Sequence, residues 1–150
     1  MRALVIAAHL FLGVGWLGAM SYSLFMVQPK AARYFASDDE AHEDFLTTLA
    51  HGARWKVVGL IAALAATGVL LTVLATDRDA GWWAGVAAKS ALLLAASGVF
   101  WWVSWRAWPA RVFALPAERA RWRRRFRVAA LTMLGCGGLA AFLGVLITPR

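Results

Sequence analysis

The hydrophobic positions of this chain fall into four long blocks, residues 3–27, 56–76, 82–108 and 127–148. Each block is close to or longer than the roughly 20 residues that a helix needs to cross the hydrocarbon core of a bilayer. Their interiors are runs of Ala, Leu, Val and Gly without the alternation typical of a β-barrel strand. The pattern therefore predicts an all-α integral membrane protein, a bundle of four transmembrane helices that forms one domain over residues 1–150.

The overall composition supports the same class. Hydrophobic residues make up 61% of the 150 residues, and the mean hydropathy is +0.62. A soluble domain of this size cannot bury so much apolar surface. The excess is expected to face lipid.

Basic residues predict the orientation of the bundle, because they gather in short cytoplasmic loops. Arg2, Arg78 and Arg150 mark one side of the membrane. Twelve basic residues mark the other side: Lys30, Arg33, Arg54, Lys56, Arg106, Arg111, Arg119, Arg121, Arg123, Arg124, Arg125 and Arg127. Both termini are therefore expected on the outer side, with the two longer loops in the cytoplasm.

Most of the net charge of +8 comes from one stretch, residues 118–127, with the sequence ERARWRRRFR. A basic run of this kind is also found in proteins that bind nucleic acid. Because it directly precedes a predicted span, we interpret it as a topology signal that contacts anionic lipids, with no nucleic-acid partner.

The loop between the first two spans, residues 28–55, carries five of the eight acidic residues. Ser37, followed by three acidic residues, is typical of a helix N-cap with a negatively charged first turn. If this helix continues into the second span, it forms an amphipathic extension that carries His42 and His51. Nine residues apart, these two histidines do not share a helix face.

Several classes of chemistry are disfavoured by what the spans contain. No Asp or Glu lies inside any of the four blocks, which disfavours a carboxylate pathway for protons or cations. Cys136 is the one cysteine, so no disulfide or cluster of thiolates can form within the chain, and its glycine neighbours indicate a packing role. The sequence also has no nucleophile triad, P-loop or Rossmann glycine pattern.

Two ionisable residues lie well inside the predicted spans, His9 and Lys89, whereas Arg106 lies in the last turn of the third span, where an arginine side chain can reach the interface. They lie six and seven residues from the outer start of the first and third blocks, which corresponds to a depth of about 9 to 10 Å for each. An ionisable side chain at that depth costs several kcal/mol unless it is paired, hydrated or neutral, so each is a candidate functional residue.

The residues near His9 and Lys89 fit a flat aromatic ligand that carries carboxylates. Helical spacing places a histidine, a glycine and large side chains on one face of the first span: His9, Gly13, Trp16 and Met20. The third span repeats such spacing, and the second span reaches a similar height with two further residues: Trp82, Gly85, Lys89, Thr67 and Gly68.

Haem b matches this set, with an imidazole for iron, glycines against the macrocycle and an ammonium for a propionate. Lys89 is then also the candidate catalytic residue. In the alternative interpretation, His9 hydrogen-bonds a neighbouring helix, Lys89 extends toward the interface, and the small residues only pack the bundle.

All four spans resemble those of the copper-resistance D family of membrane proteins. The first, HLFLGVGWLGAM, has that family's His and the Trp seven residues later, and the second, RWKVVGLIAALAATGVLL, has its Thr-Gly pair. The third, GWWAGVAAKSALLLA, is similar to the family's helix with one intramembrane Lys, and RRFRVAALTMLGCGGLAAFLGVLITP is similar to its closing helix. The resemblance implies a multi-pass protein of the bacterial inner membrane that functions in copper uptake or tolerance.

The His and Lys arrangement is also similar to that of the HemJ-type bacterial protoporphyrinogen oxidases, a related four-helix family that binds haem b. The resemblance implies that His9 and Lys89 are the essential residues. The chain has LFMVQPK after the first span, without the His of that family, and no Glu-Arg pair before the second span. These differences weigh against porphyrinogen oxidation as the activity.

Three functions therefore remain open from the sequence. The first is a haem b protein for redox or electron-transfer chemistry. The second is a copper-handling protein in which His9 and Met20 ligate the metal, although soft ligands are few. The third is an accessory subunit that docks through its small-residue helices, either as a homo-oligomer or in a larger membrane complex.

Overall fold

The computed structural model describes residues 1–76 and 78–146, and within them it contains α- and π-helices without β-strands. Four helical stretches in this part are long and apolar enough to cross a membrane: Arg2–Tyr34, Ala53–Val73, Ala80–Val112 and Pro116–Leu146. The prediction of an all-α protein with four spans is confirmed, and the chain is a multi-pass membrane protein. Thr148, the expected end of the last span, and Arg150 lie outside the described residues.

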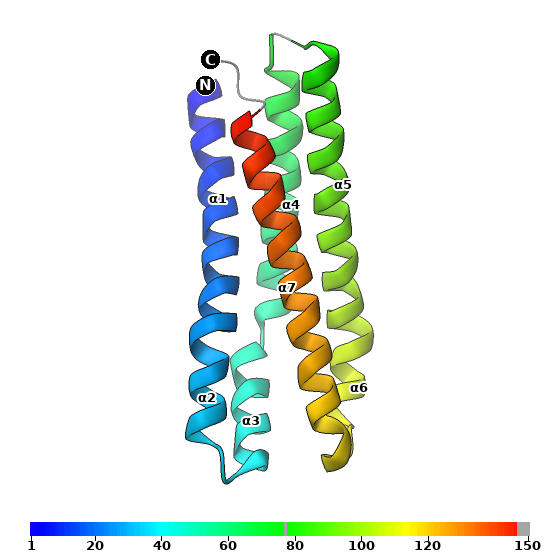
Figure 1. Cartoon of the computed structure of the whole chain (residues 1–150). Helices are drawn as coiled ribbons and strands as arrows, with labels where there is room; N and C mark the ends of the chain where they lie inside the picture. Colours follow the sequence, from blue (N-terminus) through cyan, green and yellow to red (C-terminus); the bar gives the residue numbers. More distant parts are fainter. Residues whose placement is uncertain (77, 147–150) are drawn as a thin grey trace. The chain divides into compact units, whose positions relative to one another are not determined.

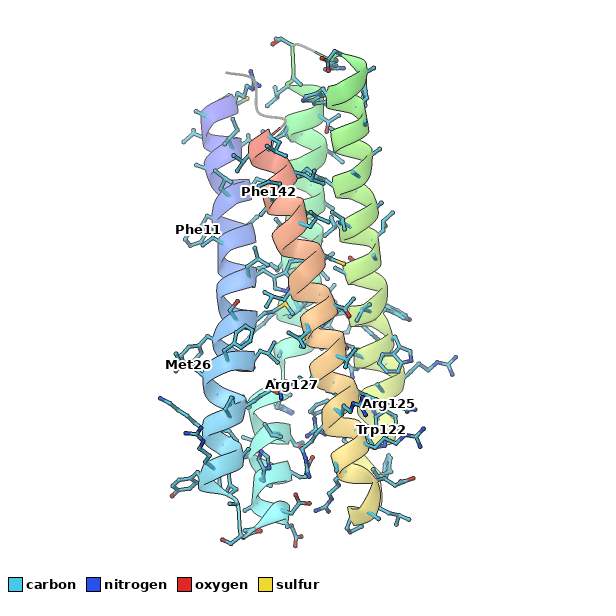
Figure 2. All side chains as sticks on the ribbon, viewed as in Figure 1. Phe11, Met26, Trp122, Arg125, Arg127 and Phe142 are labelled. Atoms are coloured by element: carbon cyan, nitrogen blue, oxygen red, sulfur yellow. The ribbon has the colours of Figure 1, made fainter. Side chains whose placement is uncertain are left out.

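The chain divides into two compact units, with the boundary between Gly68 and Val69 inside the second span. Most side chains in the span segments are exposed, including large apolar ones such as Phe11 on the first span and Phe142 on the last (Figure 2). An exposed surface of this kind is suited to lipid tails rather than to water.

The first unit begins with one continuous helical rod made of α1 (Arg2–Tyr22), the π-helical segment η1 (Ser23–Val27) and α2 (Gln28–Tyr34) (Figure 1). Pro29 explains the wide turn, because proline has no N–H and its ring clashes with the carbonyl four residues earlier. The N–H of Gln28 instead bonds the carbonyl of Ser23, five residues back. The helix therefore extends past the expected end of the first span.

The rest of the first unit contains α3 (Asp39–Ala50) and the start of α4 (Ala53–Val73). The predicted cap is displaced by one residue: Asp38, not Ser37, accepts a hydrogen bond from the N–H of Ala41 at 2.9 Å. The helix does not continue into the second span, a possibility that the sequence left open, because it ends at His51, which has a ψ of 130°, and Gly52 follows with a φ of +71°.

An aromatic cluster connects α2 to α3, which lies alongside it (Figure 1). The ring of Phe35 stacks on His42 with centroids 6.0 Å apart and also contacts Phe45 at 5.5 Å. His42 is buried in this cluster. The cluster holds the short helix against the end of the first span.

The second unit repeats the long bent rod and follows it with one long helix. The rod consists of α5 (Ala80–Trp102), the π-helical segment η2 (Val103–Ala107) and α6 (Trp108–Val112), and α7 (Pro116–Leu146) packs against α5. Two carboxylates cap these helices: Asp79 accepts from the N–H of Trp82 at 2.7 Å, and Glu118 accepts from the N–H of Leu115 at 3.3 Å.

The two rods follow the same plan with an offset of 80 residues. The π-helical segment starts at Ser23 in the first rod and at Val103 in the second. A proline follows each segment, Pro29 in the first rod and Pro109 in the second. The buried positions repeat with the same offset, as in the pairs Trp16 and Ala96, and Leu24 and Ser104. We conclude that the units are built on equivalent rods, although few residues are identical between them.

The four-span topology predicts which loops share a side of the membrane. We expect Ser37→Cys and Leu115→Cys, each in a Cys136→Ala background, to lie on the cytoplasmic side. They should react with a membrane-impermeant maleimide only when the cytoplasmic face of the membrane is accessible to the reagent. Thr76→Cys, in the loop between α4 and α5, should react in intact spheroplasts, because one span separates it from each of the other sites. Labelling of all three sites from one side would contradict the four-span arrangement.

Candidate cofactor site

His9 lies on the half-buried face of α1 and is bonded to the second span. Its Nδ1 is 2.7 Å from Oγ1 of Thr67 on α4. The contact that the sequence left as an alternative, a hydrogen bond from His9 to a neighbouring helix, is therefore present.

The surroundings of Thr67 determine which partner carries the proton. Oγ1 of Thr67 is 2.7 Å from the carbonyl oxygen of Ala63 and 3.1 Å from that of Leu64. Two oxygens approach to 2.7 Å only with a proton between them, so the single hydroxyl proton is donated to the helix backbone. Thr67 must then accept from His9. The imidazole is protonated on Nδ1, and in its neutral form the lone pair lies on Nε2.

Two glycines belong to the predicted surroundings of the imidazole, Gly68 and Gly13. A Cβ at Gly68 would lie 3.6 Å from Cε1 of His9, which is ordinary van der Waals contact. A Cβ at Gly13, one turn along α1, would meet no atom within 4 Å in the part of the chain that the structure describes. The space beside Gly13 is open, as it is beside Gly15 and Gly18, and room for a ring there stays a prediction.

Trp16 and Met20, which were predicted on the same face of α1 as His9, are also turned inward, but they lie farther along the helix axis. Trp16 is buried and Met20 is half-buried, whereas Phe11 between them and His9 is 80% exposed. Met20 follows His9 by eleven residues in one continuous helix, a rise of about 16 Å. The structure therefore does not bring His9 and Met20 to one metal ion.

In the second unit, Lys89 is half-buried on α5 and points at a glycine of α7. Its Nζ lies 2.8 Å from the position that a Cβ would take at Gly144. The other two residues predicted on this face are also inward, with Gly85 buried and Trp82 half-buried. Trp82 stacks edge-on against Trp83, with ring centroids 4.9 Å apart.

His9 and Lys89 occupy equivalent positions in the two units. Lys89 follows His9 by 80 residues, the offset that relates the two rods, and each side chain lies against a glycine of the next span in its own unit, Gly68 or Gly144. Sequence reasoning did not identify Gly144, because a glycine in an apolar span has many packing roles. The 80-residue offset of the prolines Pro29 and Pro109 was a signal for the equivalence of His9 and Lys89, but it does not indicate Gly144.

The remaining candidate ligands do not assemble into a metal site of side chains alone. Within residues 1–76 and 78–146, no group of three or more His, Cys, Asp or Glu side chains could hold a metal ion. Cys136 is a half-buried free thiol in α7. His42 lies in the aromatic cluster of α3, and His51 is the residue that ends that helix.

Comparisons with known proteins find no relative of this chain. No family model, no curated protein and no solved structure matches this chain.

The hydrogen bond between His9 and Thr67 should contribute to the stability of the fold. We expect Thr67→Val to lower the free energy of unfolding in detergent by about 1 kcal/mol, because it leaves the buried Nδ1–H without an acceptor. Thr67→Ser should retain most of that stability.

Thr132→Val on α7 is the matched control, because Thr132 bonds only the carbonyl of Val128, at 3.0 Å. Its effect should stay within about 0.5 kcal/mol. Equal losses for Thr67→Val and Thr132→Val in reversible unfolding would show that His9 gains nothing from Thr67.

Proposed function

We propose that this protein binds haem b inside a bacterial inner membrane, where Nε2 of His9 would hold the iron, and that it serves redox or electron-transfer chemistry. The observation that carries the proposal is the hydrogen bond from Nδ1 of His9 to Thr67. Haem, when bound, would supply one-electron transfer at its iron.

The geometry of His9 has the form that metal ligation requires. A ligating histidine almost always donates its second ring N–H to a fixed acceptor, which sets the tautomer and the direction of the ring. Thr67 fills that role, because its own proton is held by the backbone of α4. The residues present therefore fit an iron ligand at Nε2.

Haem is favoured over copper by the ligands that the chain offers. Haem brings four nitrogen ligands of its own, so the protein needs to supply only one or two. A copper site built from side chains needs several soft or imidazole ligands together. The described residues provide no such cluster, and Met20 is too far along α1 to join His9 on one ion.

Lys89 is proposed as the cationic partner of a haem propionate or of another tetrapyrrole carboxylate. Within the described residues it has no ion pair or hydrogen bond, and its ammonium lies in space that Gly144 leaves open. An anionic partner would stabilise the half-buried ammonium. Lys89 holds the position in its own rod that His9 holds in the other, 80 residues apart.

The test is an absorption spectrum of the detergent-purified protein before and after dithionite. We expect a Soret band in the wild type and a loss of most bound haem in His9→Ala, because the axial ligand supplies the affinity for iron. His42→Ala is the matched control and should keep the wild-type ratio of haem to protein, since His42 lies in the α3 cluster. Retention of haem by His9→Ala would rule out the proposed ligand, and metal analysis with copper but no Soret band would favour the copper function.

Lys89 should behave as a charge partner rather than as an iron ligand. We expect Lys89→Met to retain some haem with faster loss on dilution, and Lys89→Arg to recover part of the retention, because a guanidinium also pairs with a carboxylate. The reduced-minus-oxidised spectrum should keep its wild-type band positions in both variants. A spectral shift as large as that of His9→Ala, without recovery by arginine, would identify Lys89 as a ligand instead.

A further inference from the structure

We propose that one face of α7 binds the phosphate groups of anionic phospholipids in the cytoplasmic leaflet. This face, here called the arginine face, consists of Arg121, Arg124 and Arg125. At 100° per residue the three side chains fall within an arc of about 100° on the helix. All three are exposed, whereas Arg119 and Arg123 on the opposite side of the same turns are half-buried.

The arginine face continues directly into the part of α7 that faces lipid tails. Val128 lies within the same arc and is exposed, and Leu139 and Phe142 continue the stripe farther along the helix, 50% and 60% exposed. Figure 2 shows Arg125 and Phe142 on this one helix, toward its two ends. A surface that is apolar along the span and cationic at its end matches the layers of a bilayer leaflet.

The spacing along the helix places the guanidinium groups at the level of the headgroups. Arg125, Arg124 and Arg121 precede Val128 by three, four and seven residues, a rise of about 4.5, 6 and 10.5 Å. The polar region of one leaflet is about 5 to 8 Å thick. If the hydrocarbon begins near Val128, the long arginine side chains reach the whole phosphate layer.

No carboxylate of α7 neutralises this face. Glu118 is the one acidic residue of the helix, and its carboxylate accepts from the N–H of Leu115. The described residues give Arg121 and Arg124 no hydrogen bond or ion pair. Arg125 lies over the ring of Trp122 at 5.1 Å, a contact that orients its side chain and leaves its charge uncompensated.

The chemistry of the face favours a phosphate ligand held at a membrane surface. A guanidinium group binds phosphate oxygens with two parallel hydrogen bonds, which makes arginine well suited to phosphate recognition. Free phosphate would not benefit from the apolar stripe below the arginines. A phospholipid fits both parts, because its acyl chains cover the apolar stripe where it begins at Val128 while its phosphate meets the guanidinium groups.

The experiment compares two double variants of the full-length protein that lose the same charge from opposite faces of α7. R121Q/R125Q removes arginines from the arginine face, and R119Q/R123Q removes them from the opposite side. Each protein is reconstituted in phosphatidylcholine vesicles with spin-labelled phosphatidylglycerol or spin-labelled phosphatidylcholine. Electron paramagnetic resonance then measures the fraction of each lipid that the protein immobilises.

We expect the wild type to immobilise phosphatidylglycerol in preference to phosphatidylcholine. In R121Q/R125Q the ratio of the two immobilised fractions should fall by about fivefold for each arginine removed, because a basic residue at the surface contributes roughly 1 kcal/mol. R119Q/R123Q should keep most of the preference, and R121K/R125K should keep part of it. Added inorganic phosphate at millimolar concentration should not compete. Equal losses in the two glutamine variants, or no preference in the wild type, would overturn the proposal, and competition by inorganic phosphate would show a site for the free ion instead.

Discussion

The hydrogen bond from His9 to Thr67 is the interaction on which the candidate site depends. In the hydrocarbon region no water is present to satisfy a polar side chain, so an imidazole on a span needs a partner from a neighbouring helix. Thr67 can act only as an acceptor toward His9, because its proton is held by the carbonyl oxygens of Ala63 and Leu64. One backbone contact in the second span thus fixes the tautomer of a histidine in the first.

The comparison of the two units shows how the same helical plan holds two different polar groups. Thr67 directly precedes Gly68, and the corresponding neighbour of Gly144 is Leu143, which offers no side-chain acceptor. An imidazole in the second unit would therefore lack the bond that orients His9. A lysine is suited to that environment, because its flexible chain can place the ammonium against Gly144, where no side chain takes up the space.

Hydropathy was sufficient to predict the four spans, because each block is apolar over the full thickness of a bilayer. Depth along the spans was also sufficient to select His9 and Lys89, since few ionisable residues lie inside. Other features depend on contacts that a single sequence does not show. The bond to Thr67 and the position of Lys89 against Gly144 arise from packing between spans, and the end of α3 depends on the backbone angles of His51 and Gly52.

The central claim is that His9 carries its proton on Nδ1 and directs an unprotonated Nε2 toward a ligand position. The most direct measurement is nitrogen-15 nuclear magnetic resonance of selectively labelled histidine in a His42→Gln/His51→Gln background, where His9 is the one remaining histidine. For the cofactor-free protein above neutral pH, we predict a protonated Nδ1 and an unprotonated Nε2, and loss of this tautomer preference in Thr67→Val. A protonated Nε2 with a bare Nδ1 would contradict the account, because Thr67 would then donate to His9 and the nitrogen proposed for iron would carry the proton.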